Sequence, residues 1–318
     1  MVHWDMASNP DKADSQTAGD TVQVPGDPVL ADLYAVPYEL FQPAAPLLPF
    51  VFASPHSGRI YPQALLQLSR LSGLSLRRSE DAYVNELFAG VVDLGAPLIA
   101  ARFPRAYVDA NRAPSELDAS MFEGALSVPV DHASPRVNAG LGVIPRIVRD
   151  GAEIYRVKLK PSDAEERLER LHRRYHTALA NIVREAHARF ATVVVVDCHS
   201  MPSAASAPDV VLGDRYGTAA SPALLRRAEQ AFLSQGFSVG RNVPYAGGYT
   251  TRLYGQPAKG IHAVQVEVNR ALYLDEDRIQ LTAGFSDVRA RLVFAVRELV
   301  EIDANLLRPQ RGMRLAAE

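Results

Sequence analysis

Cysteine is almost absent from this sequence: the 318-residue chain has a single one, Cys198. One cysteine excludes an internal disulfide and any zinc cluster built from cysteines, and it suits the reducing environment of the cytosol. A bound metal ion would therefore have to be held by histidine and carboxylate side chains.

Long hydrophobic runs and an excess of one charge are also missing. No apolar stretch approaches the roughly 20 residues that a membrane-spanning helix needs. The formal net charge is −2, which gives no reason to expect nucleic acid or an anionic membrane as a partner. Residues 1–20 lack the basic start and apolar core of a signal peptide. We therefore expect a soluble cytoplasmic protein.

No internal repeat and no linker divides the chain, whose 47% hydrophobic and 22% charged residues are ordinary for a globular protein. We predict a disordered tail over 1–26, a single domain over 27–308 and a frayed C-terminus over 309–318. Strand patterns alternate with helix patterns in the domain. This order predicts an α/β fold with a mixed central sheet flanked by helices on both faces, three layers in all. The oligomeric state is left open.

Polar residues stand at the ends of three predicted strands. All three are predicted to be buried, and the continuous apolar run of Thr192–Val196 is typical of a strand buried on both faces of a sheet. Because α/β sheets bind ligands beyond the carboxyl ends of their strands, we expect these polar side chains to lie in a ligand crevice. The runs and their polar residues are Thr192–Val196 with His199, Pro49–Ala53 with His56, and Ile261–Val268 with Glu267.

The rest of the chain predicts further helices and strands and one long loop. Residues 113–151 are rich in proline, serine and glycine, so we expect an irregular excursion over the site. His172, His176 and His187 lie on one predicted helix, but no H-E-x-x-H motif joins them, which favours surface or core histidines. The predicted helices are Leu65–Leu76, Ala82–Leu94, Ala164–Arg189 with a capping box at Ser162, Ser221–Gln235 and Phe285–Asn305, and the further strands are Pro97–Ala101, Asp209–Gly213 and Phe237–Val239.

The residue types at the strand ends suggest mononuclear zinc hydrolysis. A catalytic zinc takes three ligands from histidine and carboxylate side chains and keeps one position for water. A carboxylate outside the metal shell serves as general base, and arginines bind a substrate carboxylate. Most of the candidates also have a purely structural interpretation, but Glu267 within a run of valines needs a partner or a function.

Several motifs resemble those of the N-formylglutamate amidohydrolases (N-formylglutamate deformylases), zinc hydrolases related in fold to the carboxypeptidase and aspartoacylase group. The matching stretches follow the family order over most of the chain. They are Ser54-Pro-His-Ser-Gly58, Asp81 with the helix after it, Arg105-Ala-Tyr-Val-Asp-Ala-Asn-Arg112, Asp197-Cys-His-Ser200, Gly247-Gly-Tyr-Thr-Thr-Arg252 and His262-Ala-Val-Gln-Val-Glu-Val268.

The resemblance implies one zinc ion per chain, with His56 and His199 as two of its ligands. Carboxypeptidase-type sites place a glutamate three residues after the first histidine, where this chain has Arg59. The acidic position of the resembled family falls instead at the start of the next helix, so the resemblance implies Asp81 as the third ligand, with Glu80 as the alternative. The other implied roles are a general base at Glu267, polarisation of the carbonyl by Arg105, and substrate binding by Asn111, Arg112, Thr250 and Arg252.

The implied reaction is hydrolysis of the N-formyl, or another N-acyl, amide of an acidic amino acid in histidine or amino-acid catabolism. The expected substrate is N-formyl-L-glutamate, which gives formate and L-glutamate. Two alternatives stay open: a zinc carboxypeptidase or amidase that acts on short peptides or other N-acyl amino acids, and an inactive module that binds carboxylates. A serine hydrolase is disfavoured, because the sequence has no G-x-S-x-G motif.

Overall fold

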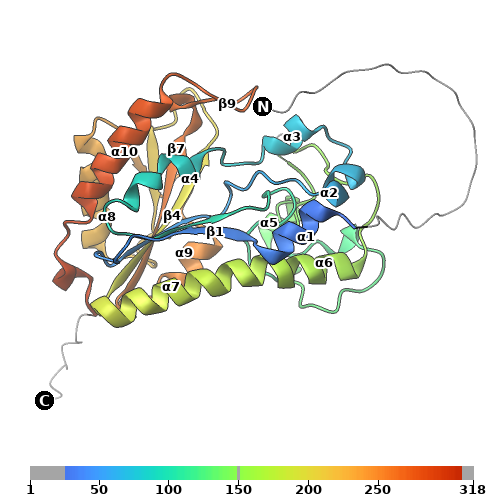
Figure 1. The fold of residues 1–318 in the computed structure, drawn as a ribbon, viewed down its shortest axis with the longest axis horizontal. Coiled ribbons are helices and arrows are strands. Elements are labelled where there is room, and N and C mark those ends of the chain that lie inside the picture. The colour runs from blue at the N-terminus through green and yellow to red at the C-terminus, as the bar shows by residue number, and fades with distance from the viewer. Residues whose placement is uncertain (1–25, 149–150, 310–318) are drawn as a thin grey trace, which may run out of the picture.

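The computed structural model describes residues 26–148 and 151–309 of the chain. The predicted disordered tail and the predicted frayed C-terminus lie almost wholly outside these residues. Within them, the chain forms one α/β unit around a seven-stranded sheet (Figure 1). No helix in the described part of the chain is both long and apolar enough to cross a lipid bilayer.

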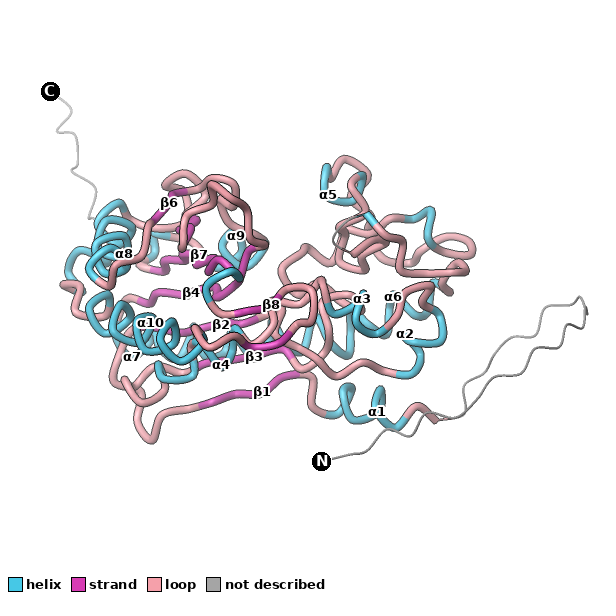
Figure 2. The backbone as a smooth tube through the Cα atoms, turned by 90° about the horizontal axis from the view of Figure 1, so that it is seen from above, coloured by secondary structure: helices cyan, strands magenta, loops and turns pink. Residues whose placement is uncertain are grey.

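The strands of the central sheet lie in the order β1-β3-β2-β4-β7-β5-β6 (Figure 2). β3, β2, β4 and β7 run parallel, whereas β1 and β5 are antiparallel to β3 and β7. The sheet is therefore mixed, as predicted. The strands are β1 (Tyr38–Phe41), β2 (Phe50–Ser54), β3 (Leu98–Ala101), β4 (Val193–Met201), β5 (Val210–Gly213), β6 (Val239–Arg241) and β7 (Ile261–Asn269), and a separate ribbon pairs β8 (Leu274–Asp275) with β9 (Gln280–Leu281).

Helices cover both faces of this sheet, which confirms the predicted layers (Figure 1). On one face, α7 (Arg174–Phe190) contacts β2 and β4, and α9 (Tyr249–Tyr254) contacts β4 and β7. On the other face, α4 (Val84–Leu87) contacts β4, α8 (Pro222–Ser234) contacts β5, and α10 (Phe285–Leu299) packs against both of these helices.

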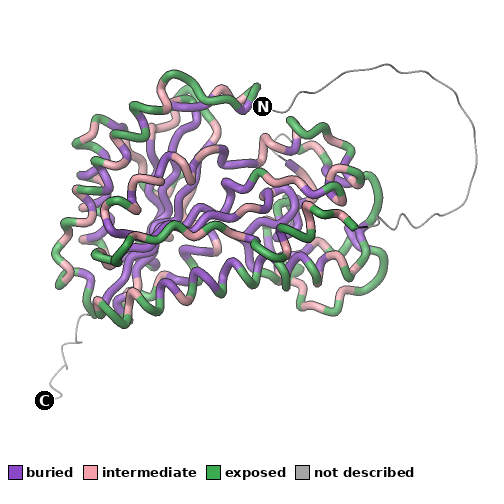
Figure 3. The backbone as a smooth tube through the Cα atoms, viewed as in Figure 1, coloured by how far each residue is buried: buried purple, intermediate pink, exposed green. Residues whose placement is uncertain are grey.

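Alternate residues of the central strands serve two separate cores. Val193 and Val195 of β4 belong to the core beneath α7, while Val194 and Val196 belong to the core beneath α8 and α10. All four are buried, and the central strands appear as purple tubes in Figure 3. A strand with helices on both faces has no position that faces water, so its sequence is continuously apolar rather than alternating.

Two predicted helices are shorter than the sequence suggested. Leu65–Leu76 is interrupted: α2 covers Gln63–Leu68 and α3 covers Gly73–Arg77. The second helix starts where the Ser72 side chain accepts a hydrogen bond from the Ser75 N–H, a typical N-cap. Ala82–Leu94 forms only α4 and a 3₁₀ turn at Ala89–Val91, because Tyr83 takes a left-handed conformation with φ 63° that no helix interior allows.

The long predicted helix after residue 160 is present but not uniform. It consists of α6 (Pro161–Arg167), a π-helical segment (Leu168–Arg173) and α7. The predicted capping box at Ser162 is wrong, because the helix already begins at Pro161. The Asp163 carboxylate instead accepts a hydrogen bond from the Lys160 N–H at 3.2 Å.

The pattern analysis did not identify α1 (Pro28–Ala35), β1 or α9. The last helix was predicted to reach Asn305, but α10 ends at Leu299. The predicted strand Phe237–Val239 begins two residues before β6. The predicted irregular loop is confirmed over its described residues, where only a 3₁₀ turn (Ala119–Met121) and α5 (Pro135–Asn138) are helical.

Candidate active site

The predicted strand-end residues converge where β2, β4 and β7 lie side by side. The sequence pattern placed the end of the fourth strand before Asp197, but β4 continues through Met201. His199 therefore lies within the strand, directly opposite Glu267 of β7. Side chains opposite each other on adjacent parallel strands point to the same face. The register itself thus places an imidazole beside a carboxylate.

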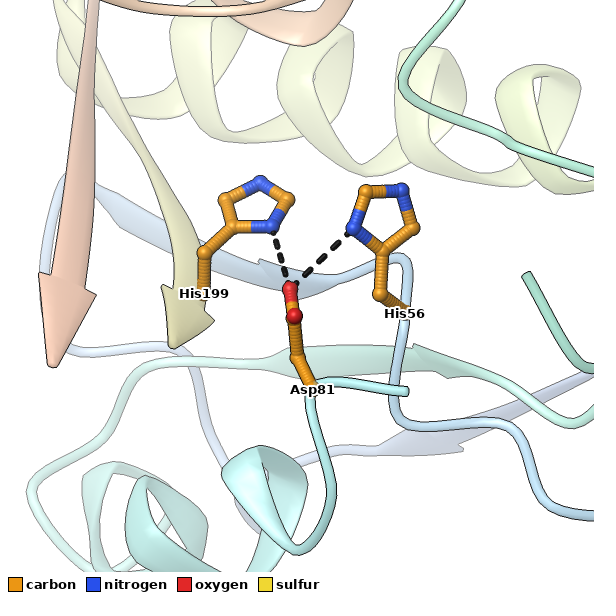
Figure 4. A group of neighbouring side chains, drawn as sticks. All are labelled: His56, Asp81 and His199. Carbon is orange, nitrogen blue, oxygen red and sulfur yellow. Dashed lines mark hydrogen bonds and ion pairs between the residues drawn. The ribbon is translucent and has the colours of Figure 1, made fainter. Parts of the chain in front are cut away.

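Three side chains meet in a buried cluster, His56, Asp81 and His199 (Figure 4). The Asp81 Oδ2 atom lies 3.1 Å from His56 Nδ1 and 2.8 Å from His199 Nδ1. Each of the three is only 2% exposed. The Asp81 N–H also donates to the His56 carbonyl at 3.1 Å, so the backbone ties the two segments together.

Glu80, the alternative third ligand, points elsewhere. Its carboxylate accepts hydrogen bonds from the Tyr61 hydroxyl at 2.8 Å and from Arg77 Nε at 3.0 Å. Glu80 and Asp81 are both buried. Neither is therefore a solvent-exposed residue of a charged turn. The geometry puts Asp81, and not Glu80, in the cluster.

A second layer of charged groups surrounds the cluster. His56 Nε2 lies 2.6 Å from Asp109 Oδ1, and His199 Nε2 lies 3.0 Å from Asp197 Oδ2. The other oxygen of Asp81 accepts a hydrogen bond from Arg270 Nη2 at 2.9 Å. Each imidazole thus has one ring nitrogen directed at Asp81 and the other at a buried carboxylate.

This arrangement fits a metal ion. An imidazole that donates Nε2–H to a carboxylate keeps its Nδ1 lone pair for a metal, and such carboxylate–histidine pairs are the usual outer layer of zinc sites. Two imidazoles and one carboxylate are also a common ligand set for catalytic zinc. Ligands about 2.0 Å from a tetrahedral zinc lie roughly 3.3 Å apart, close to both spacings around Asp81. The residues present could therefore hold the ion.

Opposing effects set the charge of these groups. Burial raises the pKa of Asp81, but hydrogen bonds from His199 and His56 outweigh it and hold that pKa well below its usual range. Burial lowers the pKa of His199, and the charge and hydrogen bond of Asp197 more than reverse this. For Asp109, the effect of burial is outweighed by Arg112, and the pKa lies well below normal. The carboxylates of Asp81 and Asp109 are therefore ionised despite their burial.

Glu267 lies beside this cluster and lines the same cavity, which has a volume of about 340 Å³. Its Oε1 accepts a hydrogen bond from Gln265 Nε2 at 2.7 Å. Burial, partly offset by the positive charge of His199, raises the pKa of Glu267 to about 7. A carboxylate with such a pKa suits proton transfer near neutral pH, which is what general-base chemistry needs.

Arg105 and Arg112 line the cavity as well. Arg105 Nε donates to Asp109 Oδ2 at 2.9 Å, so the acid that holds His56 also positions this arginine. Arg112 Nε donates to the Leu141 carbonyl at 2.9 Å. Burial lowers the pKa of Arg112 to about 10 although Asp109 acts in the opposite direction.

Asn111 links the cluster to the loop before α9. Its Oδ1 accepts from the Thr250 N–H at 2.8 Å, and its Nδ2 donates to Asp197 at 3.1 Å. Gly248 packs directly on this amide, because a Cβ there would lie 2.6 Å from Asn111 Cγ. Thr250 is fully buried and outside the residues that line the cavity. Its contact with substrate stays a prediction, while its backbone orients Asn111.

The structure separates Arg252 from the other predicted site residues. Asn111 and Arg112 line the main cavity, but Arg252 lines a neighbouring one. The histidines of the long helix do not join the cluster either. His172 and His176 are buried, and their Nε2 atoms hydrogen-bond to the carbonyls of Arg112 and Ala110 at 2.9 and 2.7 Å.

Sequence reasoning assigned no role to four groups that shape the site: Asp109, Gln265, Arg270 and Gly248. Nothing in the sequence says which imidazole or carboxylate Asp109 and Arg270 touch. Gln265 carries a usable signal, since it lies two residues before Glu267 in the same strand and so shares its face.

Comparison with known proteins gives a consistent result. Residues 48–274 match the family described as N-formylglutamate amidohydrolase. An N-formylglutamate deformylase from Pseudomonas aeruginosa is 30% identical over 265 residues, which are 80% of this chain and 92% of the relative. A deformylase of the same name from Pseudomonas putida is 29% identical over 72% of this chain and 83% of its own length.

Solved structures show the same fold. The crystal structure of an N-formylglutamate amidohydrolase from Ralstonia eutropha superposes with a TM-score of 0.78 at 33% identity, over 83% of this chain and 97% of the other. A gene product from Agrobacterium tumefaciens gives a TM-score of 0.60 at 20% identity, over 85% and 94% of the two chains, and supports the fold alone.

Proposed function

The chain belongs to the N-formylglutamate amidohydrolase family, and from this premise we propose that it hydrolyses N-formyl-L-glutamate to formate and L-glutamate with one zinc ion. The observation that carries the proposal is the buried His56–Asp81–His199 cluster with the Glu267 carboxylate beside it in one cavity. The names of the relatives support the choice of substrate.

His56, Asp81 and His199 would hold the zinc ion in this mechanism. When bound, the ion supplies a Lewis acid that polarises the amide carbonyl and lowers the pKa of a water molecule. Asp109 and Asp197 orient the two imidazoles through their Nε2 atoms, and Arg270 fixes Asp81. The ligands are thus in position before the substrate binds.

Glu267 would be the general base. It takes a proton from the attacking water and passes it to the nitrogen of the leaving glutamate, so one carboxylate serves both steps. Gln265 keeps Glu267 in place through the hydrogen bond to Oε1. Arg105, which lines the same cavity, directs a positive charge at the carbonyl oxygen, where negative charge develops. Arg112 and Asn111, which also line this cavity, would bind the α-carboxylate.

The test combines metal analysis with a hydrolysis assay on purified protein. We expect about one zinc per chain, release of formate from N-formyl-L-glutamate, loss of activity with a chelator and recovery with zinc. Glu267→Gln should lower kcat by about 100- to 10,000-fold and retain the metal. Full activity in this variant would refute the assignment of the base.

A matched pair of variants tests the third ligand. Asp81→Asn should lose the metal, whereas Glu80→Gln, which changes the neighbouring buried acid, should retain it. The opposite result would place the ligand at Glu80. Short peptides with a free C-terminus belong in the same assay, because their preferential cleavage would favour the carboxypeptidase or amidase alternative. Failure to cleave any of these compounds would favour a binding module.

A further inference from the structure

A second cavity adjoins the main one and is lined by three arginines. Its volume is about 320 Å³, close to that of the main cavity, and the two share Arg136 and Gly248 as a common wall. Arg215 and Arg252 complete the set of guanidinium groups, and Tyr249 lines it too. Arg136 and Arg215 lie outside the motifs that carry the family resemblance.

Arg215 is repelled by the other two guanidinium groups of the cavity. Burial, then the charges of Arg252 and Arg136, lower the pKa of Arg215. The Arg252 guanidinium lies 5.5 Å from the centre of the Tyr249 ring. Among the described residues, none of the three forms an ion pair. Like charges gathered around a cavity are stabilised when an anion binds between them.

The acids in this cavity are already engaged. Both oxygens of Glu116 accept hydrogen bonds, one from the Ala113 N–H at 2.7 Å and one from the Ser134 hydroxyl at 2.8 Å. Asp131 accepts from the Ala133 N–H at 3.0 Å. These hydrogen bonds hold the two carboxylates in the loop, and in the described part of the chain neither carboxylate forms an ion pair with Arg136, Arg215 or Arg252.

The backbone holds Arg215 in an unusual conformation. Its φ of 54° is left-handed, which is uncommon for a residue other than glycine. The Arg215 N–H donates to the Ala246 carbonyl at 2.7 Å, and the Asn242 side chain accepts from the N–H groups on either side, at 3.1 and 3.2 Å. Surrounding hydrogen bonds thus fix the direction in which this side chain leaves the loop.

Positively charged residues line both the second cavity and the main cavity, where the reaction would take place. Arg136 lines both cavities, and its charge is one of the groups that lower the pKa of Arg112 in the main cavity. In N-formylglutamate the α-carboxyl carbon is two bonds from the amide nitrogen and the side-chain carboxyl carbon is four bonds away. The side chain is therefore the part of the substrate better able to reach from the main cavity toward the adjoining one.

We propose that Arg136, Arg215 and Arg252 form a subsite for the side-chain carboxylate of the substrate. The inference rests on the proposed function and adds the residues that select acidic side chains. The volume of the second cavity, about 320 Å³, leaves room for a longer acid, so the substrate class is N-formyl amino acids with an acidic side chain of glutamate length or more.

The test compares N-formyl-L-glutamate, its neutral isostere N-formyl-L-glutamine, and N-formyl-L-2-aminoadipate, which is one methylene longer. The variants are Arg136→Gln, Arg215→Gln and the pair together, with Arg226→Gln on the exposed face of α8 as the matched control. Circular dichroism verifies that each is folded.

We expect the unmodified enzyme to prefer formylglutamate over formylglutamine in kcat/KM by about 10-fold or more, and to hydrolyse the aminoadipate compound. The double variant should lose about 10- to 100-fold for both acids, mostly through KM, with the glutamine compound unchanged. Equal kcat/KM values for N-formyl-L-glutamate and N-formyl-L-glutamine would overturn the subsite and leave the proposed function intact. An equal loss of kcat/KM for both compounds in the double variant would do the same. If the unmodified enzyme hydrolyses none of the three compounds, the proposed function itself is overturned.

Discussion

His176 predicts how stability responds to acid. Its side chain is 9% exposed, and its Nε2 lies 2.7 Å from the Ala110 carbonyl. Burial, with a further contribution from nearby His172, lowers the pKa of His176 to about 3. In the unfolded chain a histidine titrates near 6.5, so between these two values the unfolded state takes up a proton that the folded state does not.

The sign and size of the effect follow from this difference. A pKa that is lower in the folded state makes folding less favourable as the pH falls below 6.5. Each pH unit costs about 1.4 kcal/mol, so the loss from His176 between pH 6.5 and pH 5 is about 2 kcal/mol. The buried acids Asp81 and Asp109 have lowered pKa values and contribute only at more acidic pH.

His176→Gln removes the titrating group and retains a side-chain N–H that can donate to Ala110. We expect the free energy of unfolding, measured by urea titration at several pH values, to fall about 2 kcal/mol less between pH 6.5 and pH 5 in the variant than in the unmodified protein. Parallel curves for the two proteins would refute a neutral, buried His176.

Two further predictions concern the site. Asp109→Asn should weaken metal binding about 10- to 100-fold in a chelator competition assay. The introduced amide would donate a hydrogen bond to His56 Nε2 and so move the ring proton to Nδ1, the nitrogen that faces the metal. Unchanged affinity would show that Asp109 does not orient His56. Gly248→Ala should cost about 1–3 kcal/mol in urea unfolding and reduce activity, because its Cβ would displace Asn111, while Gly73→Ala, where a Cβ meets nothing within 4 Å, is the control. Equal effects of the two glycine substitutions would contradict this explanation.

The central strands were predictable because their burial determines their composition. Phe50–Ala53 and Val193–Val196 are apolar without interruption, since both faces of the sheet are covered, and no helix of normal length fits between the turn residues that bound them. The polar residues at their ends then identified His56 and His199 as neighbours, because parallel strands end at the same edge.

The rest depended on contacts distant in sequence. The polar residues after Val196 suggested a strand end, yet β4 continues because β7 pairs with it residue by residue. The amphipathic pattern over Ala82–Leu94 suggested a helix, but the segment must turn to bring Asp81 to His56. Arg136 and Arg215 gave no local signal, because their shared cavity exists only after residues 113–148 fold against the loop before α9.

The cluster in Figure 4 also constrains the order of folding. Asp81 lies 25 positions after His56 and 118 positions before His199. During synthesis, two of the three groups are made long before the third, and loops of this length close late. β4 must pair with β2 before the three groups can meet. Under the proposed function, the metal therefore binds strands that have already paired, unlike the ion of a zinc finger, which drives the folding of its own domain.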